Sequence, residues 1–250
     1  MAQSYDNIEY IIVDGNSGDG TMDVINEYHD KIAHVISEED NSLYEAINKG
    51  ILKATGDIVG ILNSDDIFHT KKIVGNIVKD FQLLGVDSLY GNLVYTASKD
   101  NDRIKRYWRG GEFVRGKMKW GWMPPHPTFY CKRKVYLLHG LYDSRLGTSA
   151  DYELMLRLLY IKEISTHYHG ELMVRMSSGG ISNRSIMNRI KANAMDSKAW
   201  KVNKLDTPPF FRILKPLLKL SQFKVGIYLI NAALIYLLLK CANRFGRASR

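Results

Sequence analysis

Two adjacent carboxylates, Asp65 and Asp66, follow a short apolar run at positions 58–62. A run of this length between glycine and polar turn residues predicts a buried strand of an α/β sheet. Ligands of such sheets bind just beyond the carboxyl ends of the strands. Adjacent acids repel each other unless a cation neutralises them, and their oxygens suit Mg²⁺ or Mn²⁺ shared with phosphates. The pair therefore indicates a divalent metal site, while a solvated turn before the next helix remains an equal alternative.

Three other side chains lie where one expected element meets the next. Asp14 ends the apolar stretch 7–14, where a carboxylate can bond a base or ribose or can simply stabilise a turn. Asp151 lies at the expected start of a helix, as a general base or only as a helix cap. His126 lies in the Pro-rich turn 124–127, exposed to a site or structural.

The elements that must position these residues alternate in the first hundred positions. Strand patterns cover 7–14, 32–36, 58–62 and 88–96, and helix patterns cover 21–31, 43–54 and a segment capped by Thr70. Ser42 and Glu45 form a capping box for the second helix, and the third is expected to bury Ile73, Ile77, Phe81 and Leu84. This order predicts an α/β fold with a mostly parallel sheet.

The second half of the chain is less regular and more basic. Positions 99–123 predict a long loop in which Arg and Lys are interleaved with Trp, followed by a strand at 128–131, a helix at 153–160, a strand at 171–176 and a basic helix beyond 185. The net charge of +9 arises mainly after Lys99 and indicates an anionic partner: a phosphorylated ligand, an acidic membrane surface or nucleic acid. Cys131 and Cys241 provide no disulfide framework, and the polar N-terminus no cleavable signal peptide.

The C-terminal region has a different composition. Positions 210–220 are basic and amphipathic, and 225–239 are nearly continuously apolar between lysines, although shorter than the roughly 20 residues that span a bilayer. This pattern favours a helix lying in the membrane surface, drawn to anionic head groups. A helix packed on the domain or in a dimer interface is the alternative. We therefore expect a catalytic or binding domain over 1–200 and a membrane-associating helical region over 201–250.

Four sequence blocks, at Ile8–Thr21, Glu38–Asp57, Ile61–Asp66 and Ser149–Leu158, occur in an order that is specific when they are taken together. Through them, about the first 160 residues resemble the inverting family-2 glycosyltransferases of the GT-A fold. The resemblance is strongest to the small bacterial enzymes of capsule, O-antigen and exopolysaccharide assembly. It implies the GT-A nucleotide-diphospho-sugar transferase fold and a Mn²⁺ or Mg²⁺ cofactor.

The resemblance also implies roles for individual residues. Asp151 matches the catalytic base that deprotonates the acceptor hydroxyl. Asp65 and Asp66 match the metal site, with Asp65 also on the ribose, and His126 and Trp122 are expected on the acceptor side. The remaining nucleotide-sugar contacts are Asp14, which matches the acid on the base, and the second nucleotide-side block of Asp40, Asn48 and Lys49.

The implied reaction is transfer of a single sugar, with inversion, from a nucleotide-sugar that is expected to carry UDP. The acceptor would be a glycan or a polyprenyl-diphosphate-linked glycan in cell-surface polysaccharide synthesis. No Q-x-x-R-W block of processive synthases is present. The expected location is the cytoplasmic face of the inner membrane, with the protein attached peripherally.

Two departures from the family pattern matter. Asn63 replaces the first acid of the usual D-x-D motif. Family members also begin with a strand and a helix ahead of the block that matches Gln3–Asp14, and that strand is central to the sheet. We therefore expect an N-terminally truncated GT-A domain.

The sequence is also compatible with other classes of protein, to different degrees. A catalytically inactive GT-A-like binding or assembly subunit gains weight from the missing strand. A nucleic-acid-binding protein is disfavoured because the excess charge lies beside apolar helical sequence, so no nucleic-acid partner is expected. A dinucleotide-dependent oxidoreductase is disfavoured because the turn at 15–20 lacks the G-x-G-x-x-G spacing.

Overall fold

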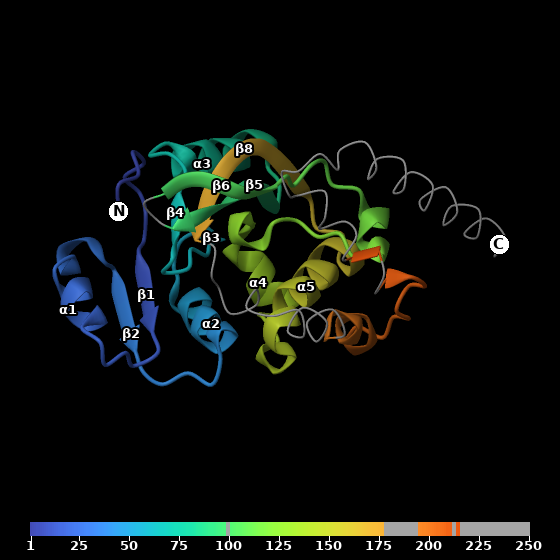
Figure 1. Cartoon of the computed structure of the whole chain (residues 1–250), viewed down its shortest axis with the longest axis horizontal. Helices are drawn as coiled ribbons and strands as arrows, with labels where there is room; N and C mark the ends of the chain where they lie inside the picture. The colour runs from blue at the N-terminus through green and yellow to red at the C-terminus, as the bar shows by residue number, and fades with distance from the viewer. Residues whose placement is uncertain (99–100, 178–194, 212–213, 216–250) are drawn as a thin grey trace.

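The computed structural model describes residues 1–98, 101–177, 195–211 and 214–215. Its elements form a central mixed sheet with a smaller two-stranded unit beside it (Figure 1). The expected helix beyond 185 lies mostly outside the described residues, as does most of the apolar C-terminal sequence. Among the described residues, no helix combines the length and the hydrophobicity needed to cross a bilayer.

The larger sheet has six strands in the order β3-β7-β5-β8-β4, with β6 also paired to β5. Their bounds are β3 (Ile58–Gly60), β4 (Asp66–Phe68), β5 (Ser88–Ser98), β6 (Asn101–Trp108), β7 (Tyr130–Lys132) and β8 (Thr166–Ser177). Only β5 and β8 run parallel, and the other four pairings are antiparallel. The expectation of a mostly parallel sheet was therefore wrong, because β6 folds back along β5 and the short strands β4 and β7 run against their longer neighbours.

The first two strands form a separate parallel pair. They are β1 (Ile11–Asp14) and β2 (His34–Ser37), joined through α1 (Thr21–Asn26) and a 3-10 turn at His29–Lys31. Both strands and α1 lie at one end of the molecule, away from the larger sheet (Figure 1). Among the described residues, no strand pairs with the second edge of β1 or of β3.

A cavity of ≈ 2410 Å³ is lined by residues of both β1 and β3. Apolar side chains of α2 (Leu43–Lys53) and α3 (Ile73–Leu84) also line it, among them Ile47, Ile51, Ile77 and Phe81. The same cavity continues to the loop after β3 and to Asp151. The two-stranded unit and the larger sheet are therefore separated by a cavity with apolar walls, and this cavity is continuous with the candidate site.

Both helices beside the cavity begin close to their predicted positions. The Ser42 hydroxyl accepts a hydrogen bond from the Glu45 backbone amide at 3.2 Å, which confirms Ser42 as the cap of α2. The other half of the predicted capping box differs, because Glu45 Oε2 accepts from the Asn41 backbone amide at 3.0 Å and not from that of Ser42. In α3 the predicted inward residues Ile73, Ile77 and Phe81 are buried, but Leu84 is half exposed. The prediction failed at Leu84 because the helix ends there, before Gly85 turns the chain at a φ of 65°.

The predicted loop at 99–123 instead contains β6 and a 3-10 turn at Arg115–Trp120. Arg106 of β6 is buried, with its guanidinium 4.6 Å from the ring centroid of Tyr95 and 5.5 Å from that of Trp108. An arginine between aromatic rings fills an inward-facing position of a strand. Hydrophobic periodicity cannot reveal such a strand, because its inward side chain is charged.

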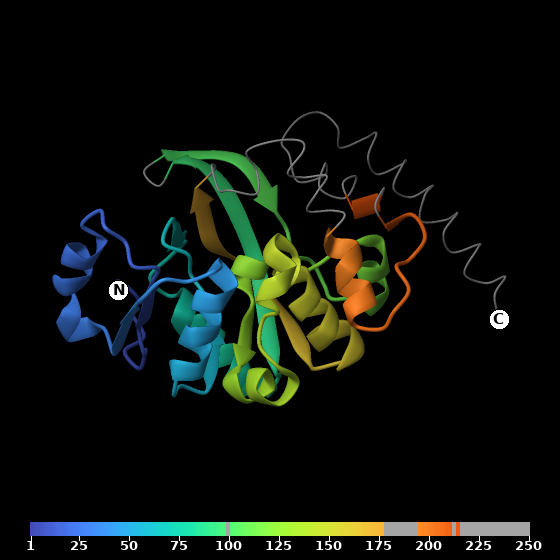
Figure 2. The same ribbon diagram turned by 90° about the horizontal axis from the view of Figure 1, so that it is seen from below.

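The second half of the chain forms a helical layer against the sheet (Figure 2). It contains α4 (Arg133–His139), a 3-10 turn at Ser144–Ser149 and α5 (Ala150–Met155), which continues as a π-helix over Leu156–Ile161. A further helical stretch at 195–202 places Trp200 edge-on to Tyr160 at a centroid distance of 5.3 Å. Phe211 packs on Tyr152 at a centroid distance of 5.5 Å, so Phe211, unlike the exposed Phe210 before it, belongs to the core around α5.

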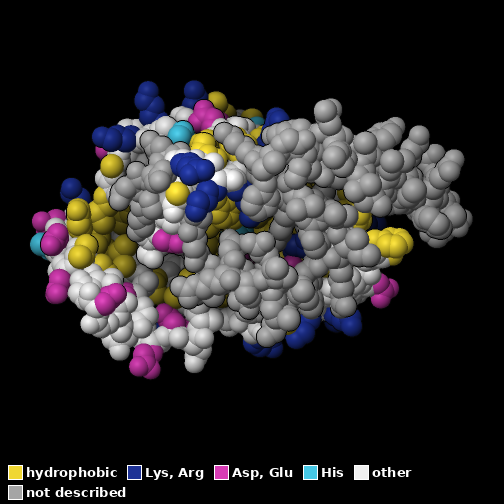
Figure 3. Space-filling view, in the orientation of Figure 1, with side chains coloured by type: hydrophobic (Ala, Val, Ile, Leu, Met, Phe, Trp, Pro, Cys, Tyr) yellow, Lys and Arg dark blue, Asp and Glu magenta, His cyan; other side chains and the backbone are white. Residues whose placement is uncertain are grey.

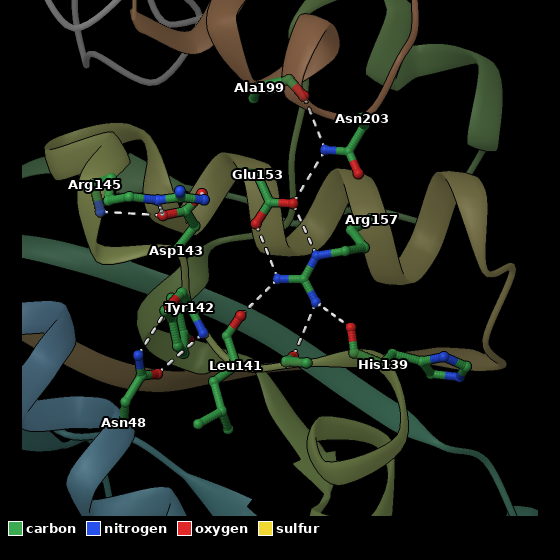
Figure 4. A network of polar contacts seen from close by, with 11 residues as sticks. Asn48, His139, Leu141, Tyr142, Asp143, Arg145, Glu153, Arg157, Ala199 and Asn203 are labelled. Atoms are coloured by element: carbon green, nitrogen blue, oxygen red, sulfur yellow. Dashed lines mark hydrogen bonds and ion pairs between the residues drawn. The ribbon is translucent and has the colours of Figure 1, made fainter.

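One guanidinium joins the two helices of this layer (Figure 4). Arg157 donates two hydrogen bonds to the buried carboxylate of Glu153, at 2.8 and 2.9 Å, and three more to the carbonyls of His139, Gly140 and Leu141. These carbonyls end α4 and have no partner within that helix. A cation there also interacts favourably with the negative end of the helix dipole. Arg157 therefore fixes α5 to the chain segment that enters it.

Replacing Arg157 by alanine should lower the free energy of unfolding by about 3–5 kcal/mol, because the buried Glu153 carboxylate would lose its cation. Urea denaturation followed by circular dichroism measures the change. Arg145→Ala is the control, since its pair with Asp143 is local and the Arg145 side chain is 84% exposed. Equal denaturation midpoints for Arg157→Ala and the control would contradict the role of Arg157.

Candidate active site

The two adjacent acids lie where the turn after β3 enters β4, and both line the cavity. Asp66 begins β4 and is 4% exposed, whereas Asp65 is partly exposed. The side-chain amide of Asn63 donates to Asp66 Oδ2 at 2.9 Å, and the backbone amide of Asp66 donates to the backbone carbonyl of Asn63 at 3.0 Å. Asn63 thus holds the side chain of Asp66 from the position where the family's motif has an acid.

The donor chemistry of this turn fits a divalent metal that is shared with phosphates. Two carboxylates beside a cavity provide hard oxygen ligands, and Mg²⁺ commonly takes one or two protein carboxylates plus phosphate oxygens. No three His, Cys, Asp or Glu side chains of the described residues are arranged to hold a metal by themselves. A cation bound to these two carboxylates would therefore need further oxygens, such as those of a bound diphosphate. The metal-binding role of Asp65 and Asp66 stays a prediction.

Asp151 lies in the first turn of α5 and also lines the cavity. The Tyr44 hydroxyl donates to Asp151 Oδ2 at 2.8 Å, and His126 Nε2 lies 3.5 Å from the same oxygen. His126, predicted on the acceptor side, is thus a direct neighbour of the predicted base. Sequence reasoning missed Tyr44, because nothing in a single sequence marks a contact between residues 107 positions apart.

The carboxylate of Asp14 is engaged within the protein. It is buried and accepts hydrogen bonds from the Ser17 amide at 2.9 Å, the Ser17 hydroxyl at 2.6 Å and the Ser37 hydroxyl at 2.9 Å. The bonds from Ser17 hold the pKa of Asp14 below its ordinary value. In this arrangement Asp14 stabilises the turn after β1 and joins it to β2, and a contact with a nucleotide base stays a prediction.

Asp40, in the segment that follows β2, forms an ion pair with Lys49 of α2. Lys49 Nζ lies 2.7 Å from Asp40 Oδ1 and 2.6 Å from Glu38 Oε1, and these bonds raise the pKa of Lys49. The other oxygen of Asp40, Oδ2, is buried and meets no hydrogen-bond donor among the described residues. A buried acceptor without a donor is costly. Asp40 is not among the residues that line the cavity, so its nucleotide contact stays a prediction.

Asn48 links α2 to the segment before α5. Its amide nitrogen donates to the Tyr142 carbonyl at 2.8 Å, and its oxygen accepts from the Tyr142 amide at 3.0 Å (Figure 4). Two opposed bonds to one backbone unit leave the side chain little freedom to turn toward a ligand. The geometry therefore gives Asn48 a supporting function, and its predicted nucleotide contact is untested.

Trp122, the other predicted acceptor-side residue, lines the cavity. Its ring packs against Phe113 and Tyr90 at centroid distances of 6.1 and 6.2 Å, and Lys117 Nζ lies 5.7 Å from the ring centroid. An indole fixed in this way can stack on an apolar sugar face.

In the space-filling view, acidic side chains gather over the end formed by α1, β1 and β2, with exposed hydrophobic side chains beside them (Figure 3).

The chain was compared with known proteins. The model of Glycosyl transferase family 2 matches residues 1–141. An uncharacterized glycosyltransferase of Mycobacterium tuberculosis is 28% identical over 171 residues, which are 62% of this chain and 59% of that protein. A PGL/p-HBAD biosynthesis glycosyltransferase of Mycobacterium bovis is 23% identical over 189 residues, which are 72% of this chain and 70% of that protein. This chain thus spans 59% of the length of the first relative.

Solved structures share the fold at low sequence identity. Staphylococcus aureus TarS 1–349 in complex with UDP has a TM-score of 0.54 at 14% identity, covering 79% of this chain and 58% of that one. The mannosyltransferase PcManGT of Pyrobaculum calidifontis, in complex with GDP-Man and Mn²⁺, has a TM-score of 0.51 at 17% identity and covers 85% and 61%. These likenesses support a GT-A-like fold with a mixed sheet. Because the family model covers more than half of the sequence, the chain belongs to glycosyl transferase family 2.

Proposed function

We propose that this protein transfers a single sugar from a nucleotide-sugar, with UDP as the expected nucleotide, to a hydroxyl group of a glycan or lipid-linked acceptor. The observation that carries the proposal is that the adjacent pair Asp65 and Asp66 lines the same cavity as Asp151, which is far from them in sequence. Solved structures of similar fold contain UDP, UDP-GlcNAc or GDP-Man, which supports a nucleotide-sugar donor.

In the proposed reaction, Asp151 accepts the proton of the acceptor hydroxyl. The acceptor oxygen forms a bond to the anomeric carbon, and the bond from that carbon to the diphosphate oxygen breaks with its electron pair on the diphosphate. Attack on the face opposite the leaving group inverts the anomeric carbon. A divalent cation, held by Asp65 and Asp66 when bound, would neutralise charge on the departing diphosphate.

The basic, apolar sequence over 216–250 supports a second part of the proposal. We infer that it attaches the protein to the cytoplasmic face of an anionic membrane, where a polyprenyl-diphosphate-linked acceptor of polysaccharide synthesis would lie. Phe211, Leu214 and Lys215 are buried in the domain, so the attaching sequence would begin after them.

Calorimetric titration should show that UDP binds the purified chain in the presence of Mn²⁺ and more weakly in EDTA. The combined Asp65→Asn and Asp66→Asn variant should lose the metal-dependent part, because it removes both carboxylates. Asp30→Asn is the control, since the Asp30 side chain is 85% exposed. A folded wild-type chain that binds no UDP would refute the proposed donor class.

Asp151→Asn should lower the release of UDP from UDP-GlcNAc or UDP-glucose by at least about 100-fold, the usual contribution of a general base. Its affinity for UDP should stay unchanged, because the nucleotide is expected to contact other residues. The readout is UDP released with water or an added acceptor. Equal loss of UDP affinity would contradict the base assignment, and UDP binding without turnover in wild type would favour the inactive binding subunit.

The full chain should float with phosphatidylglycerol vesicles in a density gradient and lose this association in high salt, because screening weakens attraction between lysines and head groups. Deletion of residues 216–250 should abolish flotation while leaving UDP binding intact. Phosphatidylcholine vesicles are the control for charge. A truncated chain that still floats would place membrane attachment elsewhere.

A further inference from the structure

We propose that Tyr44 is a positioning residue that selects which oxygen of Asp151 accepts the proton. The inference rests on the proposed function of Asp151 as base and goes beyond it by assigning Oδ1 as the reacting oxygen. It starts from the two contacts of the carboxylate, which both fall on Oδ2. The Tyr44 hydroxyl lies 2.8 Å from it and His126 Nε2 lies 3.5 Å from it.

The hydroxyl of Tyr44 acts as a permanent donor to Oδ2. Tyr44 is 7% exposed, and burial together with the negative charge of Asp151 raises the pKa of its phenol well above the usual range. The phenol therefore keeps its proton. Hydrogen bonds from a neutral donor to a carboxylate are stronger than those between neutral groups, so this contact restrains rotation of the carboxylate.

His126 adds a second restraint at the same oxygen. Its Nδ1 is buried without a hydrogen-bond partner among the described residues, and Nε2 is the nitrogen that faces Asp151. The ring of Trp108 lies edge-on to the imidazole at a centroid distance of 5.9 Å and limits its movement.

The second oxygen of Asp151, Oδ1, receives no hydrogen bond from the described residues. Asp151 is 16% exposed and lines the cavity. An oxygen without an internal donor keeps its lone pairs for a proton. With Oδ2 engaged on one side, Oδ1 is the atom that an acceptor hydroxyl, or water in hydrolysis, can reach and protonate.

Tyr44 itself is held by the helix that carries it. Its ring stacks on Tyr142 at a centroid distance of 5.5 Å and an interplanar angle of 27°. Asn48, four residues later on the same face of α2, bonds both backbone groups of Tyr142. One helix face thus holds both the hydroxyl that contacts Asp151 and the segment that leads into α5, which makes the position of the hydroxyl stiff.

The test is Tyr44→Phe in the full chain, assayed by UDP release from UDP-GlcNAc or UDP-glucose with Mn²⁺. The change keeps the ring that stacks on Tyr142 and removes only the hydroxyl. We expect kcat to fall roughly 10- to 100-fold, the value of a hydrogen bond to a charged group. KM for the donor and the affinity for UDP should remain unchanged, because Tyr44 acts on the base and not on the donor.

Tyr168→Phe is the matched control. Its hydroxyl also donates at 2.8 Å to a side-chain oxygen, that of Asn92, and Tyr168 is not among the residues that line the cavity. This variant should retain the wild-type kcat. Replacing Tyr44 by 4-aminophenylalanine keeps both the ring and a donor at the same place, and it should restore most of the activity even if Tyr44→Phe proves unstable.

Three outcomes separate the inference from the proposed function. A folded Tyr44→Phe protein with wild-type kcat would overturn the positioning role and leave the glycosyltransferase proposal intact. Parallel loss of kcat and UDP affinity, or no rescue by 4-aminophenylalanine, would reduce Tyr44 to a structural residue. A wild-type chain that neither binds UDP nor releases it from donors would refute the proposed function itself.

Discussion

The ion pair between Arg157 and Glu153 is the contact on which the arrangement of the candidate site depends. It joins α5, which carries Asp151, to the carbonyls that end α4. Both side chains are largely buried, so neither charge is screened by solvent. Together with the two bonds between Asn48 and Tyr142, this ion pair fixes how the segment between Gly140 and Ala150 approaches α5. Loss of the ion pair would loosen the position of Asp151 relative to Tyr44.

A second constraint is that buried polar groups need partners. Asp14, Asn48 and Asp151 all find theirs inside the protein, from Ser17 and Ser37, from Tyr142 and from Tyr44. Residues that the family resemblance assigns to ligand contacts thus also hold loops and helices in place. The buried Oδ2 of Asp40 differs, since no donor among the described residues reaches it.

The division of the sheet concerns the same site. One edge of β1 and one edge of β3 pair with no strand in the described part of the chain, and both strands line a cavity that continues to Asp65, Asp66 and Asp151. An unpaired strand edge beside apolar side chains is a surface that proteins normally cover. Asp14 ends β1, so the nucleotide contact predicted for it would come from the two-stranded unit. The predicted base instead lies on α5, against the larger sheet.

Several local elements and the acidic residues of the candidate site could be predicted from the sequence alone. The cap at Ser42, the inward face of α3 and the turn that carries Asp65 and Asp66 follow from spacing and turn chemistry within a few residues. Tertiary structure decided the rest: the antiparallel pairings, the strand β6 with its buried Arg106, and the contact of Tyr44 with Asp151. Those features depend on which distant segments meet, and neither periodicity nor capping signals encode that.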